Sequence, residues 1–176
     1  TINLRSTLVI WDPLVRGIHW LLVIAFCLNY FLLESGSDEH QIVGYVAFVA
    51  VQIRLVWAFF RSGFASIKQI KLRPSDFKLH FKHLKNRNVP ENSGHNPLGW
   101  LMVLATWLLF IALATTGFLL EETDYFFGSS LVENIHSILA NSLYSIVIVH
   151  IAAIVLVGWW GRVSLITPMI TGKRKP

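Results

Sequence analysis

Four long apolar stretches, separated by polar segments, constrain this chain more than any other feature of its sequence. They cover residues 17–33, 42–60, 98–120 and 136–160. A helix needs about 20 mostly apolar residues to cross the hydrocarbon core of a bilayer, where it also satisfies its own backbone groups. Because 54% of the residues are hydrophobic and only 14% are charged, the chain is too apolar for an ordinary soluble domain. We therefore expect an all-α membrane protein whose four transmembrane helices form an antiparallel bundle.

The segments between these stretches differ in length. Residues 34–41 and 121–135 form short connections, whereas residues 61–97 form a long polar one. The long segment is expected to be a solvated connector that can carry a short amphipathic helix on anionic lipid headgroups. No small-residue cleavage site precedes the first stretch, so we expect it to stay in the protein. No repeat or low-complexity tract divides the chain, which predicts one domain over residues 1–176.

Positive and negative residues are sorted between the two sides of this predicted bundle. The positive-inside rule therefore predicts that both termini and residues 61–97 are cytoplasmic. The same sorting accounts for the net charge of +5 without a nucleic-acid partner. One side carries Arg5, Arg16, Arg61, Lys68, Lys71, Arg73, Lys78, Lys82, Lys85, Arg87, Arg162, Lys173, Arg174 and Lys175. The other side has no Lys or Arg and carries Glu34, Asp38, Glu39, Glu121, Glu122, Asp124 and Glu133.

Most tryptophans lie near the predicted cytoplasmic ends of the helices. An aromatic belt at the membrane interface has this distribution, so we expect these side chains to act as anchors. They are Trp11, Trp20, Trp57, Trp100, Trp159 and Trp160.

Four histidines lie within or at the ends of the apolar stretches. His136 and His150 are separated by fourteen residues, which advances a helix by about 21 Å and returns to within about 40° of the same face. One helix therefore offers two imidazoles at two depths. Following the chain through the membrane, His19 lies at about the depth of His150, and His40 at about the depth of His136. The four histidines therefore form two pairs, and the members of each pair lie at about the same depth in the membrane.

Each pair of imidazoles is suited to hold a haem between facing helices. Two histidine ligands make a low-spin site for electron transfer, and two such sites about 20 Å apart would carry electrons through the membrane. The single cysteine, Cys27, excludes a CxxCH attachment site, so any haem is bound without thioether links. The alternative is that these histidines are interfacial or separately hydrogen-bonded.

Other residues accompany the histidines. Gly44 and Ala140 each follow an outer histidine by one helical turn and would let a haem approach the backbone, although small residues also serve ordinary helix packing. Arg54 follows His40 by fourteen residues and is a candidate partner for the propionates of the inner haem, with Arg16 as a second candidate. Both arginines could instead reach the lipid headgroups.

Three further histidines lie outside the spans. His80 and His83 have the i, i+3 spacing of a possible metal site, but a solvated loop is the preferred interpretation because no carboxylate or cysteine joins them nearby. His95 precedes the third helix and is a candidate proton-exchanging partner for a quinone head group. No hydrolytic or nucleotide-binding motif occurs, so no catalytic residue is predicted.

Short residue patterns recur in order along the chain. The first and second stretches carry Trp11, Asp12, Pro13, Arg16, His19 and Trp20, then His40, Gly44, Tyr45, Arg54 and Trp57. The third and fourth carry His95, Asn96, Pro97, Leu98, Gly99, Thr116 and Gly117, then His136, Ala140 and His150. Together they resemble bacterial cytochrome b561 and the b-type cytochrome subunit of nickel–iron hydrogenases over nearly the whole chain. The chain is shorter than the hydrogenase subunits and lacks an additional membrane helix, so it is more similar to stand-alone cytochrome b561.

This resemblance implies a respiratory, di-haem electron-transfer protein of the bacterial inner membrane. His19 and His150 would bind the cytoplasmic haem b, and His40 and His136 the periplasmic one. Electrons would pass between the quinone pool and a redox partner. Oxidation of superoxide with reduction of quinone is an alternative, but the acidic outer residues suit a basic partner such as a periplasmic cytochrome c better than an anion. A metal or proton transporter is a further alternative, although such proteins usually have broken helices or inverted repeats, neither of which is visible here.

Overall fold

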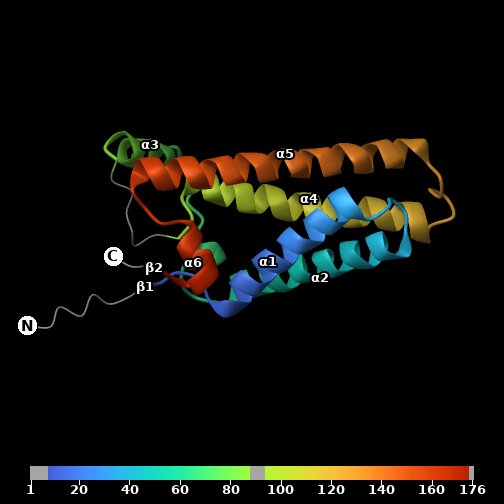
Figure 1. The fold of residues 1–176 in the computed structure, drawn as a ribbon, viewed down its shortest axis with the longest axis horizontal. Helices are drawn as coiled ribbons and strands as arrows, with labels where there is room; N and C mark the ends of the chain where they lie inside the picture. The colour runs from blue at the N-terminus through green and yellow to red at the C-terminus, as the bar shows by residue number, and fades with distance from the viewer. Residues whose placement is uncertain (1–7, 88–93, 175–176) are drawn as a thin grey trace, which may run out of the picture. The chain divides into compact units, whose positions relative to one another are not determined.

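Four long helices dominate the computed structural model, which describes residues 8–87 and 94–174 (Figure 1). They are α1 (Pro13–Cys27), which continues into a π-helical turn η1 (Leu28–Leu32), α2 (Asp38–Phe60), α4 (Pro97–Glu122) and α5 (Ser130–Gly161). Each helix, with η1 added to α1, is long and apolar enough to cross a membrane. The predicted all-α bundle of four antiparallel membrane helices is thus confirmed. Arg5 and Lys175, two of the basic residues predicted to lie on the cytoplasmic side, are outside the described residues.

The surfaces of the long helices are strongly apolar. Only 6% of the most apolar window of α5 is buried inside the protein. Large side chains such as Leu108, Ile138 and Leu156 are more than half exposed. A continuous apolar surface of this kind is unfavourable in water and is matched by lipid chains.

Three of the helices begin four or more residues earlier than the apolar pattern predicts. α1 starts at Pro13 rather than at residue 17. α2 starts at Asp38 rather than at residue 42, and α5 starts at Ser130 rather than at residue 136. At the start of α2, the Ser37 hydroxyl accepts from the backbone N of His40. The first turns of both α2 and α5 carry acidic side chains, which interact favourably with the helix dipole. His40 and His136 therefore lie inside helical turns, where their backbone is fixed.

The described residues form two compact units, and each long helix contributes to both. Among the described residues, unit 1 comprises 8–17, 57–87, 94–102 and 149–174, and unit 2 comprises 18–56 and 103–148. The single domain predicted over residues 1–176 stays a prediction.

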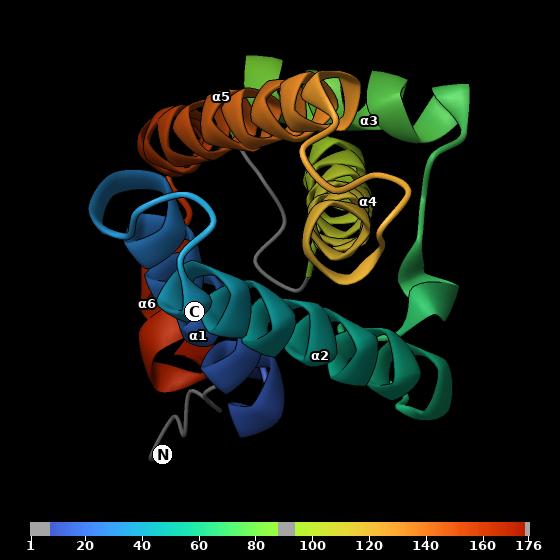
Figure 2. The same ribbon diagram turned by 90° about the vertical axis from the view of Figure 1, so that its right-hand side faces the viewer.

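Unit 2 consists of two helical hairpins. Residues 33–37 join α1 and η1 to α2, and residues 123–129 join α4 to α5; Figure 2 looks onto these two loops. Phe26, Leu109 and Leu143 form a buried cluster within the unit. This cluster packs apolar side chains of α1, α4 and α5 against one another.

Unit 1 joins the two ends of the described chain. Strand β1 (Leu8–Val9) pairs antiparallel with β2 (Lys173–Arg174), with Leu8 opposite Arg174. A short helix α6 (Ile166–Thr171) precedes β2 and ends at Gly172, whose φ is +82°. The Gly172 carbonyl accepts from the backbone N of Ile10. A buried cluster of Ile10, Trp11, Val15 and Ala65 lies beside this junction.

The long polar connection is partly helical. It contains a 3-10 turn η2 (Ile67–Gln69) and helix α3 (Pro74–Lys85), so the amphipathic helix expected there is present. Trp160 Nε1 donates to the Leu84 carbonyl, and the Arg87 guanidinium lies 4.6 Å from the Trp160 ring centre. His80 is only 5% exposed. The prediction of a solvated loop was therefore wrong at His80, because α3 packs one of its faces against the rest of unit 1.

The tryptophans do not all act as interfacial anchors. Trp159 is 69% exposed, but Trp11 is 5% and Trp100 is 0% exposed. The prediction of anchoring was wrong for these two residues, which fill the protein interior instead. Their large rings contribute to the packing of unit 1.

Candidate functional site

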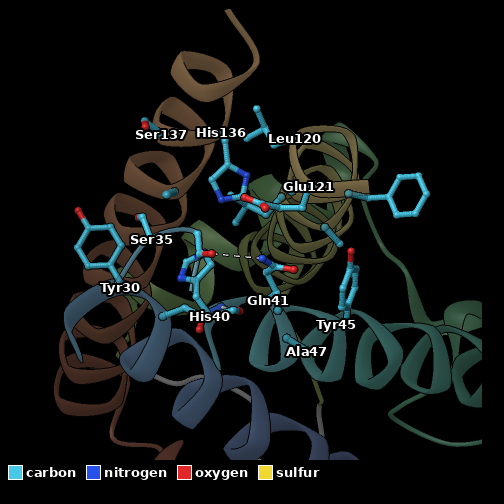
Figure 3. Close-up of a pocket in the computed structure, with 18 of the residues that line it drawn as sticks. Tyr30, Ser35, His40, Gln41, Tyr45, Ala47, Leu120, Glu121, His136 and Ser137 are labelled. Atoms are coloured by element: carbon cyan, nitrogen blue, oxygen red, sulfur yellow. Dashed lines mark hydrogen bonds between the residues drawn. The ribbon is translucent and has the colours of Figure 1, made fainter. Parts of the chain in front are cut away.

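A cavity of about 550 Å³ lies in unit 2, within the size range of sites that bind cofactors. α2, α4 and α5 line most of it, and α1 contributes aromatic and small side chains. Figure 3 shows His40 and Gln41 extending into it from α2, Glu121 from α4 and His136 from α5. Apolar side chains contribute more of its walls than polar side chains do.

His40 and His136 lie opposite one another across this cavity (Figure 3). Their ring centroids are 6.2 Å apart, and the ring planes are inclined by 57°. A first-row metal ion lies about 2 Å from a bound imidazole nitrogen, so two imidazole centres on opposite sides of one ion lie about 6 Å apart. The spacing of the two rings therefore fits a shared metal ion as it stands.

The two rings are held differently. His136 Nδ1 lies 2.7 Å from the hydroxyl oxygen of Thr116 on α4, which leaves Nε2 for a ligand. For His40, the backbone carbonyl accepts from Asn29 Nδ2 at 3.1 Å, and the ring atom Nδ1 is buried with no hydrogen-bond partner among the described residues. A side-chain contact thus orients one imidazole, and backbone contacts place the other.

Small residues leave room beside the histidines. Gly44, Gly117 and Ala140 all line the cavity. A Cβ atom on Gly117 would lie 3.7 Å from Cε1 of His136, and one on Gly44 would lie 3.6 Å from Nδ2 of Asn29. The two residues predicted to accompany the outer histidines, Gly44 and Ala140, are thus at the cavity wall. An apolar cavity with opposed imidazoles and small residues fits a flat macrocycle with a metal centre.

The polar side of the cavity includes Ser35, Gly36, Gln41, Tyr45 and Glu121. Gln41 Nε2 donates to the Gly36 carbonyl at 3.2 Å, which is the dashed line in Figure 3. Within residues 8–87 and 94–174, no group of three or more His, Cys, Asp or Glu side chains is positioned to hold a metal ion. Zinc sites normally use three or four protein ligands, so the pair of histidines suits an axial haem site better than a zinc carrier.

The other two predicted ligands belong to different units. His19 lies on the unit 2 part of α1 and packs edge-on against Trp20, with ring centroids 5.4 Å apart. His150 lies on the unit 1 part of α5 and is half-buried. Their pairing stays a prediction.

The two predicted arginines have distinct surroundings. Arg54 is 5% exposed, and its guanidinium carbon lies 5.3 Å from the centre of the Trp107 ring. Arg16 donates from Nη1 to the Ile170 carbonyl at 2.6 Å, so it holds α6 in unit 1. The Arg16 contact was not predicted, because nothing in the sequence indicates which carbonyl a distant arginine meets.

His95 lies between two buried tryptophans in unit 1. Its ring centroid is 4.6 Å from that of Trp11 and 5.2 Å from that of Trp100. The role predicted for His95, as a partner for a quinone head group, stays a prediction.

Thr116 is the main site residue for which we predicted no role, although it belongs to the residue pattern of the third stretch. It lies six residues before the end of α4, and His136 lies six residues after the start of α5. Because these helices are antiparallel and joined by a short loop, equal distances from the loop place the two side chains level. This comparison of distances requires the observed ends of both helices. The apolar pattern placed the start of α5 six residues too late, so the contact could not be predicted from it.

A family model described as prokaryotic cytochrome b561 matches residues 10–172. No curated protein and no solved structure matches the chain. The matched range includes all four histidines of the spans and residues of both units.

Proposed function

Because the chain belongs to the prokaryotic cytochrome b561 family of membrane b-type cytochromes that transfer electrons, we propose that it binds two haems b by histidine pairs and conducts electrons across the membrane. His40 and His136 hold one haem, and His19 and His150 hold the other. The observation that carries the proposal is the 6.2 Å separation of the His40 and His136 ring centroids across a cavity of about 550 Å³.

The chemistry of the two imidazoles supports electron transfer. When bound, haem supplies an iron couple that accepts and releases one electron. A haem held by imidazoles from both α2 and α5 would have no open position for a small substrate. The apolar side chains that line much of the cavity lower the polarity around a bound haem. These residues therefore favour transfer of electrons over binding of oxygen.

The second haem site rests on helix register and on the arginines. His136 and His150 are separated by fourteen residues of one continuous helix, which corresponds to about 21 Å. Arg54 is buried on α2 and is the proposed partner of the propionates at the second site, with Arg16 nearer the surface. A buried guanidinium is stabilised by an anion of this kind.

The membrane orientation and partners follow from charge. We place the protein in the bacterial inner membrane with both termini cytoplasmic, because the basic residues collect on that side. The acidic residues of the opposite side, among them Glu121, Glu122 and Asp124, suit a basic soluble partner such as a periplasmic cytochrome c. Quinone is the proposed partner within the membrane.

Haem stoichiometry tests the proposal. The purified full chain is expected to contain two haems b in a pyridine haemochrome assay. His136→Ala and His150→Ala should each lose one haem, and their reduced-minus-oxidised spectra should differ from each other. His83→Ala, which changes a histidine outside the spans, should keep both haems. A chain with no haem, or a His136→Ala variant that retains two, would contradict the proposal.

A further inference from the structure

The hydroxyl of Thr116 has three polar neighbours in unit 2. Its oxygen lies 2.7 Å from Nδ1 of His136, 2.9 Å from the Ala112 carbonyl and 3.1 Å from the Leu113 carbonyl. The side chain is buried, so these groups are its only choices among the described residues besides a ligand. A hydroxyl has one hydrogen to donate and lone pairs that accept.

The proton positions follow if His136 binds iron, which rests on the proposed function. Ligation by Nε2 requires that Nδ1 carries the proton, so Nδ1 must donate. The Thr116 oxygen then accepts from Nδ1, and the hydroxyl hydrogen goes to the Ala112 carbonyl one turn earlier on α4. Each donor and acceptor in this series of hydrogen bonds then has a partner. Only one tautomer of the His136 imidazole is compatible with the series.

We infer that Thr116 is a positioning residue that fixes the tautomer and orientation of the His136 ring and tunes the haem held by His40 and His136. Gly117 lies at the next position, where a Cβ atom would make an ordinary van der Waals contact of 3.7 Å with His136 Cε1. His40 has no equivalent contact, since its Nδ1 is buried without a hydrogen-bond partner among the described residues. The two axial ligands of one haem are therefore unequal: His136 is oriented in advance and His40 is not.

The hydrogen bond has a predictable electronic effect. When the Thr116 oxygen accepts a hydrogen bond from Nδ1–H, the imidazole becomes a stronger electron donor to the metal, and this favours ferric over ferrous iron. Losing the bond should raise the midpoint potential of this haem. Removal of such outer partners typically weakens metal binding by about 10–100-fold. A tenfold change in the ferric-to-ferrous affinity ratio corresponds to about 59 mV for one electron.

The chain offers a matched set of variants for the test. Thr116→Val removes the hydroxyl and keeps the shape, and Thr116→Ser keeps the hydroxyl. Thr115→Val is the control. Thr115 also donates to a carbonyl one turn earlier, that of Ile111, but it is exposed and forms no hydrogen bond with a histidine among the described residues. The readouts are haem per chain, the rate of haem loss to a competing acceptor, and the midpoint potential from a spectroelectrochemical titration of the full chain in detergent.

The expected result is that Thr116→Val raises the potential of one of the two haems and speeds its loss about tenfold. Thr116→Ser should stay near the wild type, and Thr115→Val should be unchanged. If Thr116→Val binds no haem at this site, retention by Thr116→Ser supports the inference and loss by Thr116→Ser overturns it. Equal effects of Thr116→Val and Thr115→Val, or no effect of either in a chain with two haems, also overturn it. A wild-type chain whose haem content does not respond to His136→Ala instead contradicts the proposed function, which separates the two failures.

Discussion

The indole Nε1 of Trp57 donates a 3.0 Å hydrogen bond to Oδ2 of Asp12, and Oδ1 of the same carboxylate accepts from the backbone N of Val15. One side chain thus caps the start of α1 and holds the end of α2 within unit 1. Asp12→Ala removes both bonds, and we expect it to lower the free energy of unfolding by about 1–2 kcal/mol. Thermal unfolding in detergent measures this loss.

Two variants separate the contributions of Asp12. Trp57→Phe removes the indole bond alone, and Asp12→Asn keeps an oxygen that can cap α1. Both are expected to be less destabilising than Asp12→Ala. An Asp12→Ala protein as stable as the wild type would show that α1 does not depend on its cap.

Gly172 lies where a side chain has no space. Its φ is +82°, and a Cβ atom would lie 2.9 Å from the Trp11 carbonyl oxygen. We expect Gly172→Ala to lower the free energy of unfolding by about 1–3 kcal/mol from backbone strain, with a further loss from the clash. Gly63→Ala is the control, because Gly63 also has a positive φ but nothing lies within 4 Å of its Cβ position. Equal destabilisation by the two variants would exclude a contribution from the Trp11 contact.

Gly44 tests the cavity between the histidines. A methyl group there meets Asn29 at an ordinary van der Waals distance, whereas a larger side chain would extend into the cavity. Haem content should therefore decrease in the order Gly44, Gly44→Ala, Gly44→Leu, with loss of one of two haems in the last. Gly17→Leu is the control, because nothing lies within 4 Å of that Cβ position on α1. Full haem occupancy in Gly44→Leu would argue against this cavity as a haem site.

The burial of His80 is expected to make the stability of the protein depend on pH. Burial lowers the pKa of His80 below its ordinary value of 6.5, and the nearby charge of His83 lowers it further. The unfolded chain therefore binds a proton at this residue more readily than the folded chain does. The stability contributed by neutral His80 is full above pH 6.5, and it is lost as the pH falls through the lower folded pKa.

His80→Leu should reduce this acid sensitivity. The variant loses no hydrogen bond at Nε2, because that atom is buried without a hydrogen-bond partner among the described residues. Chemical unfolding of both proteins between about pH 5 and 8 measures the difference. His83→Gln, at a partly exposed position of the same helix, should keep most of the acid sensitivity. A His80→Leu protein with the wild-type pH profile would exclude His80 as its cause.

The membrane helices could be predicted because their signal is long and repetitive. A run such as residues 98–120 is apolar on every face, and only a membrane or a large interior tolerates such a helix. Helix ends were less predictable, since the first turns of α2 and α5 are polar and are fixed by local hydrogen bonds and the helix dipole. His80 and Trp100 show the same limit: their burial depends on packing of segments distant in sequence.

For the candidate site, register along one helix is readable and contacts between helices are not. The fourteen-residue spacing of His136 and His150 is explicit in the sequence. The Thr116 contact depends on how α4 and α5 are rotated about their axes, which the apolar pattern leaves open when all faces are apolar. Arg16 likewise holds α6 through a hydrogen bond to a backbone carbonyl. Every residue has such a carbonyl, so the sequence does not indicate which one Arg16 contacts.

The pairing of β1 with β2 constrains how the chain threads the bilayer. Leu8 and Arg174 are neighbours in one small ladder, so the chain must return to the side from which it started. The number of crossings between them has to be even, whatever the distribution of charge. Labels attached at Val9 and Lys173 would consequently report the same compartment, and they would lie close enough to exchange energy.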